Sequence, residues 1–207
     1  HALATETLAV RKPRSMRIRF EGQLQPGVYA KDLILHLISR FGASGGTGYA
    51  IEFAGSAIRA LPIEARFTLC NMAVEFGAWT GIVAPDETTF NYVRGRPFAP
   101  GPAIWDQAVA HWRTLVSDAD AVFDREIEID CTQLGPHITW GTSPQHGGNI
   151  GDAVPDPAAE PDQNRRQSMQ RALDYMGLAP GAPLEGLPIS AAFIGSCTNS
   201  RISDLRE

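Results

Sequence analysis

Cysteine is scarce in this chain. Only three of its 207 residues are cysteine, at positions 70, 131 and 197. An odd number of widely spaced cysteines argues against a disulfide framework and favours a reducing compartment. Long hydrophobic runs are also lacking, since none approaches the roughly 20 apolar residues of a membrane-spanning helix. We therefore expect a cytoplasmic protein that does not associate with a membrane.

Positive charge is in short supply as well. The chain has 18 lysines and arginines against 23 aspartates and glutamates, which gives a net charge of -5. This balance gives no electrostatic reason to expect a nucleic-acid partner or an anionic membrane. An acidic substrate would have to be bound by local arginines, a metal or helix ends. With 43% hydrophobic residues, the chain can bury a substantial core in one large or two smaller domains.

Hydrophobic periodicity predicts that strands alternate with helices along the chain. The predicted strands cover residues 16–24, 49–53, 81–84, 124–131, 137–140 and 189–194. The predicted helices cover residues 30–41, 62–76 and 164–176, with a further helix around Trp105 to Val116 whose apolar stripe we assign to the core. This order predicts an α/β class with a three-layer α/β/α arrangement, present only in part.

The distribution of proline and glycine suggests how the chain is divided. We expect residues 1–15 to be the tail of a preceding domain and residues 16–143 to form the main α/β domain. Residues 144–163 are rich in proline and glycine and predict a linker. Residues 164–207 would then begin the next α/β domain. The chain starts at His1 rather than methionine, and we expect it to be an internal piece of a longer protein.

The sequence GSCTNSR at residues 195–201 places Cys197 between a predicted strand and a predicted helix start. Backbone N–H groups and the helix dipole favour a thiolate at such a turn. Three roles are open: a small buried side chain, a nucleophile with a histidine base, or a ligand of a metal or iron–sulfur cluster. Arg201 is placed either for contact with an anion or for local packing.

A second candidate pair is Asn71 and Glu75, four residues apart on the predicted helix 62–76. That spacing puts both side chains on one helix face. Glu75 lies near the helix C-terminus, where the dipole opposes a carboxylate. A solvated surface glutamate is the common explanation for such a residue, and the spacing alone does not exclude it.

Weaker candidates lie elsewhere in the chain. Arg94 and Arg96 flank a glycine in a predicted loop and could hold a carboxylate. The spacing of Cys131, His137 and His146 matches no compact set of zinc ligands, so we expect no zinc site there.

Four ordered segments of the chain resemble the aconitase superfamily. The cysteine segment at 195–201 resembles its first cluster-cysteine motif, and a second matching segment is 70–78 (CNMAVEFGA) after 59–61 (RAL). The other two segments are similar to the large subunits of bacterial isopropylmalate dehydratases. They are 83–90 (VAPDETTF) with 95–97 (GRP), and 140–144 (WGTSP). Their order along nearly the whole chain argues against chance similarity.

The resemblance implies a hydro-lyase that interconverts 2-isopropylmalate and 3-isopropylmalate in leucine biosynthesis, with a small subunit as the partner in a heterodimer. It implies a 4Fe-4S cluster held by three cysteines, whose open iron acts as a Lewis acid on the dicarboxylate substrate, and a base on the small subunit. It also implies that Cys197 is a cluster ligand, that Asn71 contacts the cluster region and that Glu75 is catalytic.

The resemblance also implies that the machinery is incomplete. Neither Cys70 nor Cys131 matches the Cys-x-x-Cys pair that supplies the other two ligands in the family. We therefore expect this piece alone to lack the cluster and to be inactive. Three alternatives stay open: a relative acting on another 2-hydroxy dicarboxylate of the homoaconitate or methylmalate type, a non-catalytic domain for scaffolding and subunit contact, and a thiol enzyme using Cys197 as its nucleophile.

Overall fold

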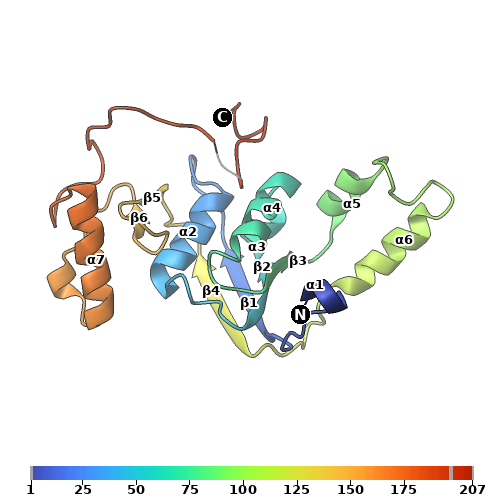
Figure 1. Ribbon diagram of the computed structural model, residues 1–207. Coiled ribbons are helices and arrows are strands. Elements are labelled where there is room, and N and C mark those ends of the chain that lie inside the picture. The colour runs from blue at the N-terminus through green and yellow to red at the C-terminus, as the bar shows by residue number, and fades with distance from the viewer. Residues whose placement is uncertain (1, 196–197, 207) are drawn as a thin grey trace.

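The computed structural model describes residues 2–195 and 198–206 (Figure 1). Four parallel strands form its central sheet in the order β3-β2-β1-β4. Alternation along β1 buries Met16, Ile18 and Phe20 on one face of the sheet. The strands are β1 (Arg14–Glu21), β2 (Tyr49–Ala54), β3 (Thr80–Val83) and β4 (Arg125–Asp130). The strands predicted in these four regions are confirmed, and so is the α/β class.

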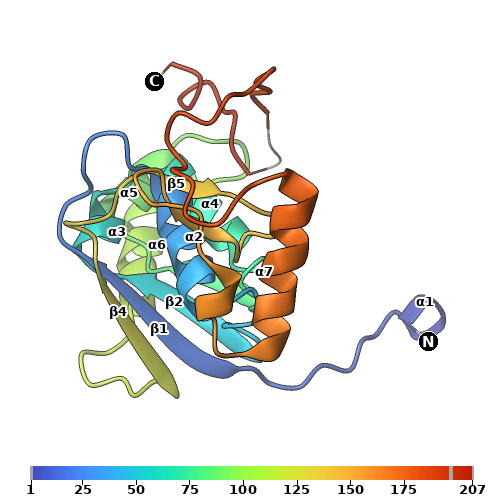
Figure 2. The same cartoon turned by 90° about the vertical axis from the view of Figure 1, so that its left-hand side faces the viewer.

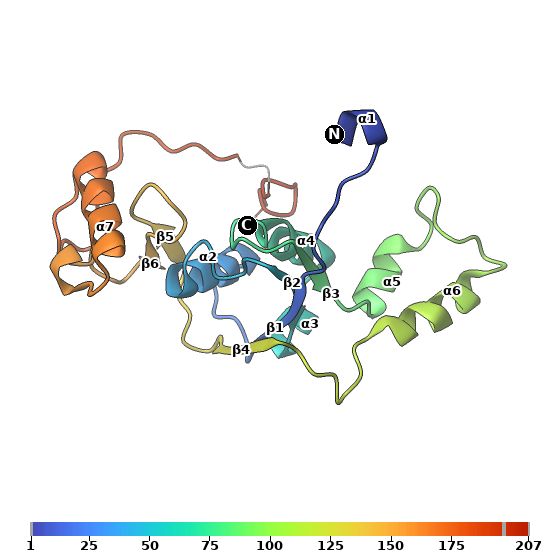
Figure 3. The same ribbon diagram turned by 60° about the horizontal axis from the view of Figure 1, so that its bottom comes forward.

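Helices α2 (Ala30–Phe41) and α4 (Ile63–Met72) lie side by side on one face of the sheet (Figure 3). Helix α2 has the predicted bounds, buries the apolar stripe that includes Leu33 and Leu37, and ends at Gly42 with a φ of 82°. The short helix α3 (Ser56–Ala60) was not predicted. It follows β2 directly, and Glu21 at the end of β1 accepts a hydrogen bond from its first backbone N–H, at 2.8 Å.

The opposite face of the sheet is crossed by a connection rather than covered by helices. A right-handed crossover from β3 back to β4 has to run along the side away from α2 and α4, and the segment before β4 does so (Figure 2). Ser117 in this segment hydrogen-bonds to Glu52 of β2, and the Arg17 guanidinium lies 4.5 Å from the Phe123 ring centre. The third layer is therefore partial in the described part of the chain.

Helices α5 (Glu87–Val93) and α6 (Trp105–Trp112), followed by the short helix η1 (Arg113–Leu115), stand to one side of the sheet (Figure 1). The core assignment of the stripe from Trp105 to Val116 is largely wrong, because Trp105 is the one buried member among these residues and both Leu115 and Val116 are exposed. Trp112 stacks on Phe90 of α5 instead. Helical spacing identifies the apolar side of a helix but not what covers it.

Residues 137–184 build a second core beside the sheet. The antiparallel strands β5 (His137–Thr139) and β6 (Gly147–Asn149), the short helix η2 (Pro157–Ala159) and α7 (Gln163–Met176) enclose it, and α7 ends at Gly177 as predicted. This core consists of Trp140, Val154, Ala172, Leu173 and Leu184. Residues 144–163, expected as a linker, thus contain a strand and a short helix, while the division into domains stays a prediction.

The predicted strand at 189–194 is wrong. Residues 189–194 have no strand conformation, and Phe193 is 91% exposed. An apolar parallel strand is stable only with neighbouring strands and with both faces covered, and the described part of the chain offers this segment neither. At the other end, α1 (Ala2–Thr5) is a single turn. No helix among the described residues is long and apolar enough to span a membrane.

Candidate functional site

Asn71 and Glu75 lie at the end of α4, which stops at Met72 instead of continuing to residue 76. Residues beyond Met72 form a closing turn in which the backbone N–H of Ala78 donates to the carbonyl of Ala73 at 3.0 Å. Gly77 has a φ of 89°, the positive value that this kind of helix ending requires. The shared helix face expected for Asn71 and Glu75 is therefore corrected: Asn71 is in the last helical turn and Glu75 is in the turn after it.

Both side chains are exposed, and neither has a hydrogen-bond or ion-pair partner among the described residues. A carboxylate without partners is free to exchange a proton with a bound molecule. An amide without partners can likewise donate and accept hydrogen bonds. Asn71 and Glu75 are thus accessible to a bound molecule, and their roles stay predictions.

The segment after the candidate cysteine docks on α4. The Thr68 hydroxyl donates to the carbonyl of Thr198 at 3.0 Å, and the Arg201 guanidinium donates to both that hydroxyl, at 3.1 Å, and that carbonyl, at 3.0 Å. Thr68 precedes Asn71 by three residues, so the two share a face of α4. Residues 198–201 are therefore held on the side of α4 that carries Thr68, and this end of the chain lies beside α4 in Figure 3. Cys197 itself lies outside the described residues.

Arg66 holds α4 to the start of α5. Its side chain is 2% exposed, and its guanidinium donates to both carboxylate oxygens of Asp86, at 2.7 and 2.9 Å, and to the carbonyls of Arg59 and Leu61. Burial alone would raise the pKa of Asp86, but hydrogen bonds from Arg66 and from the backbone N–H of Thr89 keep it below its ordinary value. Asp86 also caps α5 by accepting hydrogen bonds from the backbone N–H groups of Thr88 and Thr89.

The two described cysteines are poor metal ligands where they lie. Burial raises the pKa of Cys70, and burial together with the nearby Asp130 raises the pKa of Cys131 to about 11. Because of these raised pKa values, both thiols stay protonated near neutral pH. The form that binds iron is the thiolate. The part of the chain that the structure describes holds no group of three histidine, cysteine or acidic side chains able to bind a metal. These residues alone do not fit a 4Fe-4S cluster.

The sequence model of the aconitase family (aconitate hydratase) matches residues 1–207. The chain belongs to the aconitase family. It is 58% identical over 206 residues to "3-isopropylmalate dehydratase large subunit 1" of Bradyrhizobium diazoefficiens, a match that covers 100% of this chain and 43% of that relative. The chain thus spans less than half the length of the curated relative.

The arginine pair of this aconitase-family chain lies just after α5, where both guanidinium groups pack on aromatic rings. The Arg94 guanidinium stacks on Trp105 at 4.9 Å and that of Arg96 stacks on Tyr92 at 3.6 Å. Neither arginine pairs with a carboxylate among the described residues. Tyr92 in turn meets Phe67 of α4, with ring centres 5.5 Å apart. Among the described residues, neither arginine has a hydrogen bond or ion pair with Asn71 or with residues 198–201.

A cleft that was not predicted lies beside the docked segment of this family member. It has a volume of about 740 Å³ and lies between α2, α4, β5 and residues 199–204. At its edge Asp32 accepts a backbone hydrogen bond from His137 at 2.7 Å, and the rings of His137 and His36 meet edge to face at 5.2 Å. Asp32 and His36 both lie about a hundred positions before His137. No local sequence signal could therefore have indicated either contact.

The position of His36 beside His137 makes the stability of this aconitase-family chain sensitive to pH. Burial, with charge on His137 and Arg40, lowers the pKa of His36 from 6.5 to about 4. Between these values the unfolded chain binds a proton that the folded chain does not, so the folded state loses stability as the pH falls, by at most about 1.4 kcal/mol per pH unit. We expect His36→Gln to flatten this dependence in urea unfolding measured from pH 7.5 to 4.5. His111→Gln, at an exposed position, is the control, and equal slopes for His36→Gln and the parent would refute the assignment.

Proposed function

We propose that this chain is the part of a 3-isopropylmalate dehydratase large subunit that presents one cluster cysteine beside Asn71 and Glu75. The observation that carries the proposal is the docking of Thr198 and Arg201 on Thr68, one helical turn from Asn71. The segment that resembles the family's first cluster-cysteine motif thus docks on α4 two residues before the start of the matching segment 70–78. The 58% identity to a large subunit of that name supports the choice of substrate and of a small-subunit partner.

Within this proposal the chain's own residues have distinct tasks. Cys197 donates one thiolate to a 4Fe-4S cluster that the rest of the enzyme completes. Asn71 orients groups beside that cysteine through its unpartnered amide. Glu75 transfers a proton to or from the substrate, a 2-hydroxy dicarboxylate. We place the enzyme in the cytoplasm, in keeping with Cys70 and Cys131, which form no disulfide.

A second candidate function, scaffolding and subunit contact, has one observation in its favour. Strand β3 is an edge of the sheet, and Trp79 and Ile82 are each more than half exposed there. Exposed apolar side chains at a sheet edge are typical of a contact surface. If replacement of Glu75 leaves the complete enzyme fully active, this function is the better account of the chain.

The docking contact can be tested in the complete dehydratase, assembled from the full large subunit and its small subunit. Thr68→Val removes the hydroxyl that joins Thr198 to Arg201 and keeps the side-chain shape. We expect iron content or activity to fall about 10-fold, the size of effect seen when groups supporting metal ligands are removed. Thr80→Val, on the exposed edge of β3, is the matched control. Unchanged iron content and unchanged isomerisation of 2-isopropylmalate in Thr68→Val would refute the proposal.

The isolated chain of 207 residues gives a second test. Because its described cysteines are protonated and only Cys197 is proposed as a ligand, we expect anaerobic treatment with iron and sulfide to leave no stable 4Fe-4S cluster. Iron analysis after gel filtration, with the absorption spectrum, measures this. A stable content of four irons per chain would overturn the expected incompleteness of the site.

A further inference from the structure

Helices α5 and α6 form an arm beside the sheet, and the loop of residues 94–104, here named the tip loop, joins them at its outer end (Figures 1 and 3). Aromatic rings hold the two helices together. Phe90 stacks on Trp112 with ring centres 5.8 Å apart, and Trp105 meets Trp112 edge to face at 5.6 Å. Prolines at positions 97, 100 and 102 restrict the backbone of the tip loop. The arm therefore presents this loop in a defined shape.

Phe98 in the tip loop is fully exposed in the described part of the chain. Its φ of 66° lies in the left-handed region, which is unusual for an aromatic residue. The backbone N–H of Ala99 donates to the carbonyl of Arg96 at 3.1 Å, and that of Arg96 donates to the carbonyl of Val93 at 3.1 Å, so the loop's own hydrogen bonds support this conformation. Backbone strain of this kind concentrates at functional sites. Packing within the described residues gives no reason for an aromatic side chain at this position.

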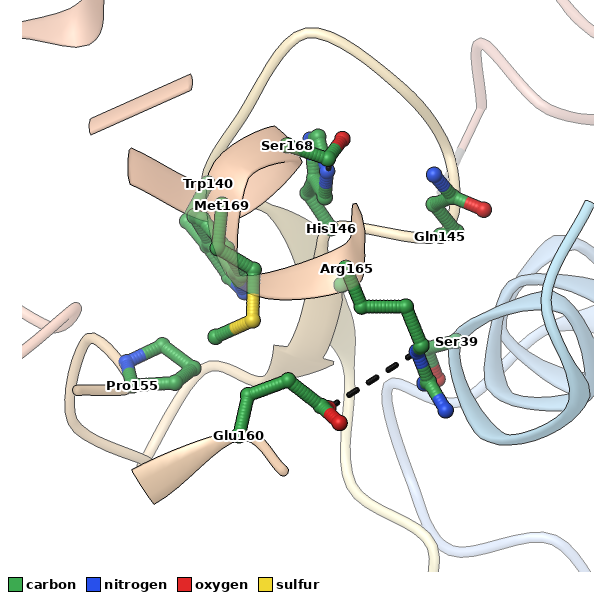
Figure 4. Close-up of a pocket in the computed structure, with 10 residues that line it drawn as sticks. Ser39, Trp140, Gln145, His146, Pro155, Glu160, Arg165, Ser168 and Met169 are labelled. Carbon is green, nitrogen blue, oxygen red and sulfur yellow. Dashed lines mark hydrogen bonds and ion pairs between the residues drawn. The ribbon is translucent and has the colours of Figure 1, made fainter. Parts of the chain in front are cut away.

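Arg94 and Arg96 are held in place in the same loop, because the guanidinium group of each packs on an aromatic ring. Nε of Arg96 also donates a hydrogen bond to the carbonyl of Tyr92 at 2.6 Å. The contrast is with Arg165, in the small cavity between α7 and the β5–β6 hairpin, whose Nε lies 3.7 Å from a carboxylate oxygen of Glu160 (Figure 4). Arg94 and Arg96 have no acidic partner among the described residues, so both charges are open to a carboxylate brought by another molecule.

A hollow of about 440 Å³ lies between these two arginines and the start of α6. Trp105 and Pro100 contribute apolar surface to its wall, and Asp106 is the single acidic residue among its described lining residues. Two positive charges against one negative charge favour an acidic group in the hollow. The tip loop thus combines a projecting aromatic ring with a positively charged hollow. Aromatic residues and arginine are enriched in the buried centres of protein interfaces.

We propose that the tip loop is a surface through which the large subunit binds its small subunit. Phe98 enters an apolar pocket of the small subunit, and an aspartate or glutamate of the small subunit enters the hollow between Arg94 and Arg96. The inference rests on the proposed dehydratase function, which includes a small-subunit partner. Segments 83–90 and 95–97, which resemble isopropylmalate dehydratase large subunits in particular, both reach this arm, and the proposed function leaves them without a task. That placement favours the small subunit over a second copy of this chain.

Calorimetric titration of the complete large subunit with the small subunit tests the proposal. We expect Phe98→Ala to weaken the association at least about 10-fold, as truncation of a central interface residue does. Folding is not at risk, because the side chain of Phe98 is exposed. Tyr175→Ala, at an exposed aromatic residue on α7, is the matched control and should associate like the parent.

Arg96→Gln is a second variant, which removes one of the two charges. Association of the parent should weaken as salt is added, and this dependence should be smaller in Arg96→Gln, a change that a purely structural role of the arginine would not produce. Equal affinity and equal salt dependence for the parent, Phe98→Ala and Arg96→Gln would overturn the proposal. So would a Phe98→Ala variant that loses stability or self-association of the large subunit alone while it binds the small subunit normally.

The affinity measurement is separate from the test of the proposed function. Isomerisation of 2-isopropylmalate at saturating small subunit reports on the function, and the affinity of the two subunits reports on the tip loop. If the subunits associate through this loop but do not isomerise the substrate, the proposed function fails and the interface stands. If Phe98→Ala and Arg96→Gln both associate like the parent in an active enzyme, the interface fails and the function stands.

Discussion

Replacing Glu75 by glutamine is expected to lower kcat of the proposed complete dehydratase by about 10²- to 10⁴-fold, the usual contribution of a group that transfers a proton in the transition state. The carboxylate is exposed beside the last turn of α4 and has no partner among the described residues, so the substitution breaks no contact there. A glutamine has nearly the same shape but cannot take up or release the proton. KM for 2-isopropylmalate should change little, because the amide still accepts hydrogen bonds.

The measurement is the rate of 2-isopropylmalate isomerisation by the purified two-subunit enzyme, with iron content determined in parallel. Glu128→Gln is the control, because Glu128 lies on the far face of the sheet with its side chain 71% exposed. A Glu75→Gln enzyme with full iron content and parental kcat would show that this carboxylate has no catalytic role.

Replacing Gly55 by alanine is expected to lower the free energy of unfolding by about 3 kcal/mol or more. Gly55 has a φ of 106°, and a Cβ added there would lie 2.2 Å from the carbonyl oxygen of Phe20. That backbone belongs to β1 and cannot move away without disturbing its ladders with β2 and β4. The estimate combines about 1–3 kcal/mol for a backbone conformation that is essentially restricted to glycine, with φ of 106° and ψ of 171°, and about 1–3 kcal/mol for overpacking.

Urea unfolding of the isolated chain measures the effect. Gly101→Ala is the matched control, since no atom lies within 4 Å of an added Cβ and its φ is not positive. It should change the stability by no more than about 0.5 kcal/mol. A Gly55→Ala chain that unfolds at the parental urea concentration would contradict the close approach of β1 to this turn.

Local patterns predicted the parts of the fold that depend on local chemistry. The alternation of Met16, Ile18 and Phe20 indicated β1, and the apolar stripe ending at Gly42 gave both ends of α2. The apolar run at 189–194 was misread as a strand, because a strand also needs neighbours and apolarity alone does not supply them. Likewise the stripe of α6 is real, yet the sheet does not reach it.

The candidate site was predictable only in part. Motif resemblance indicated Asn71, Glu75 and Cys197 together, although they are far apart in sequence. The groups that join these segments gave no such signal: Thr68 is an ordinary threonine in the sequence, and its contact with Arg201 spans 133 positions. The partnership of His36 with His137 depends on tertiary packing in the same way. Spacing rules act within a few residues and cannot indicate such contacts.

The order of the strands in the sheet has a consequence for how the chain assembles. Strands β1, β2 and β3 follow one another with short helical connections, whereas β4 pairs with β1 across a separation of 109 positions, as the bond between Ser15 and Asp124 shows. Contacts of such long range form slowly because a large loop must close first. During synthesis one edge of β1 therefore stays unpaired until β4 has been made. The charged residues Arg17 and Arg19 of β1 disfavour pairing of that edge with other chains.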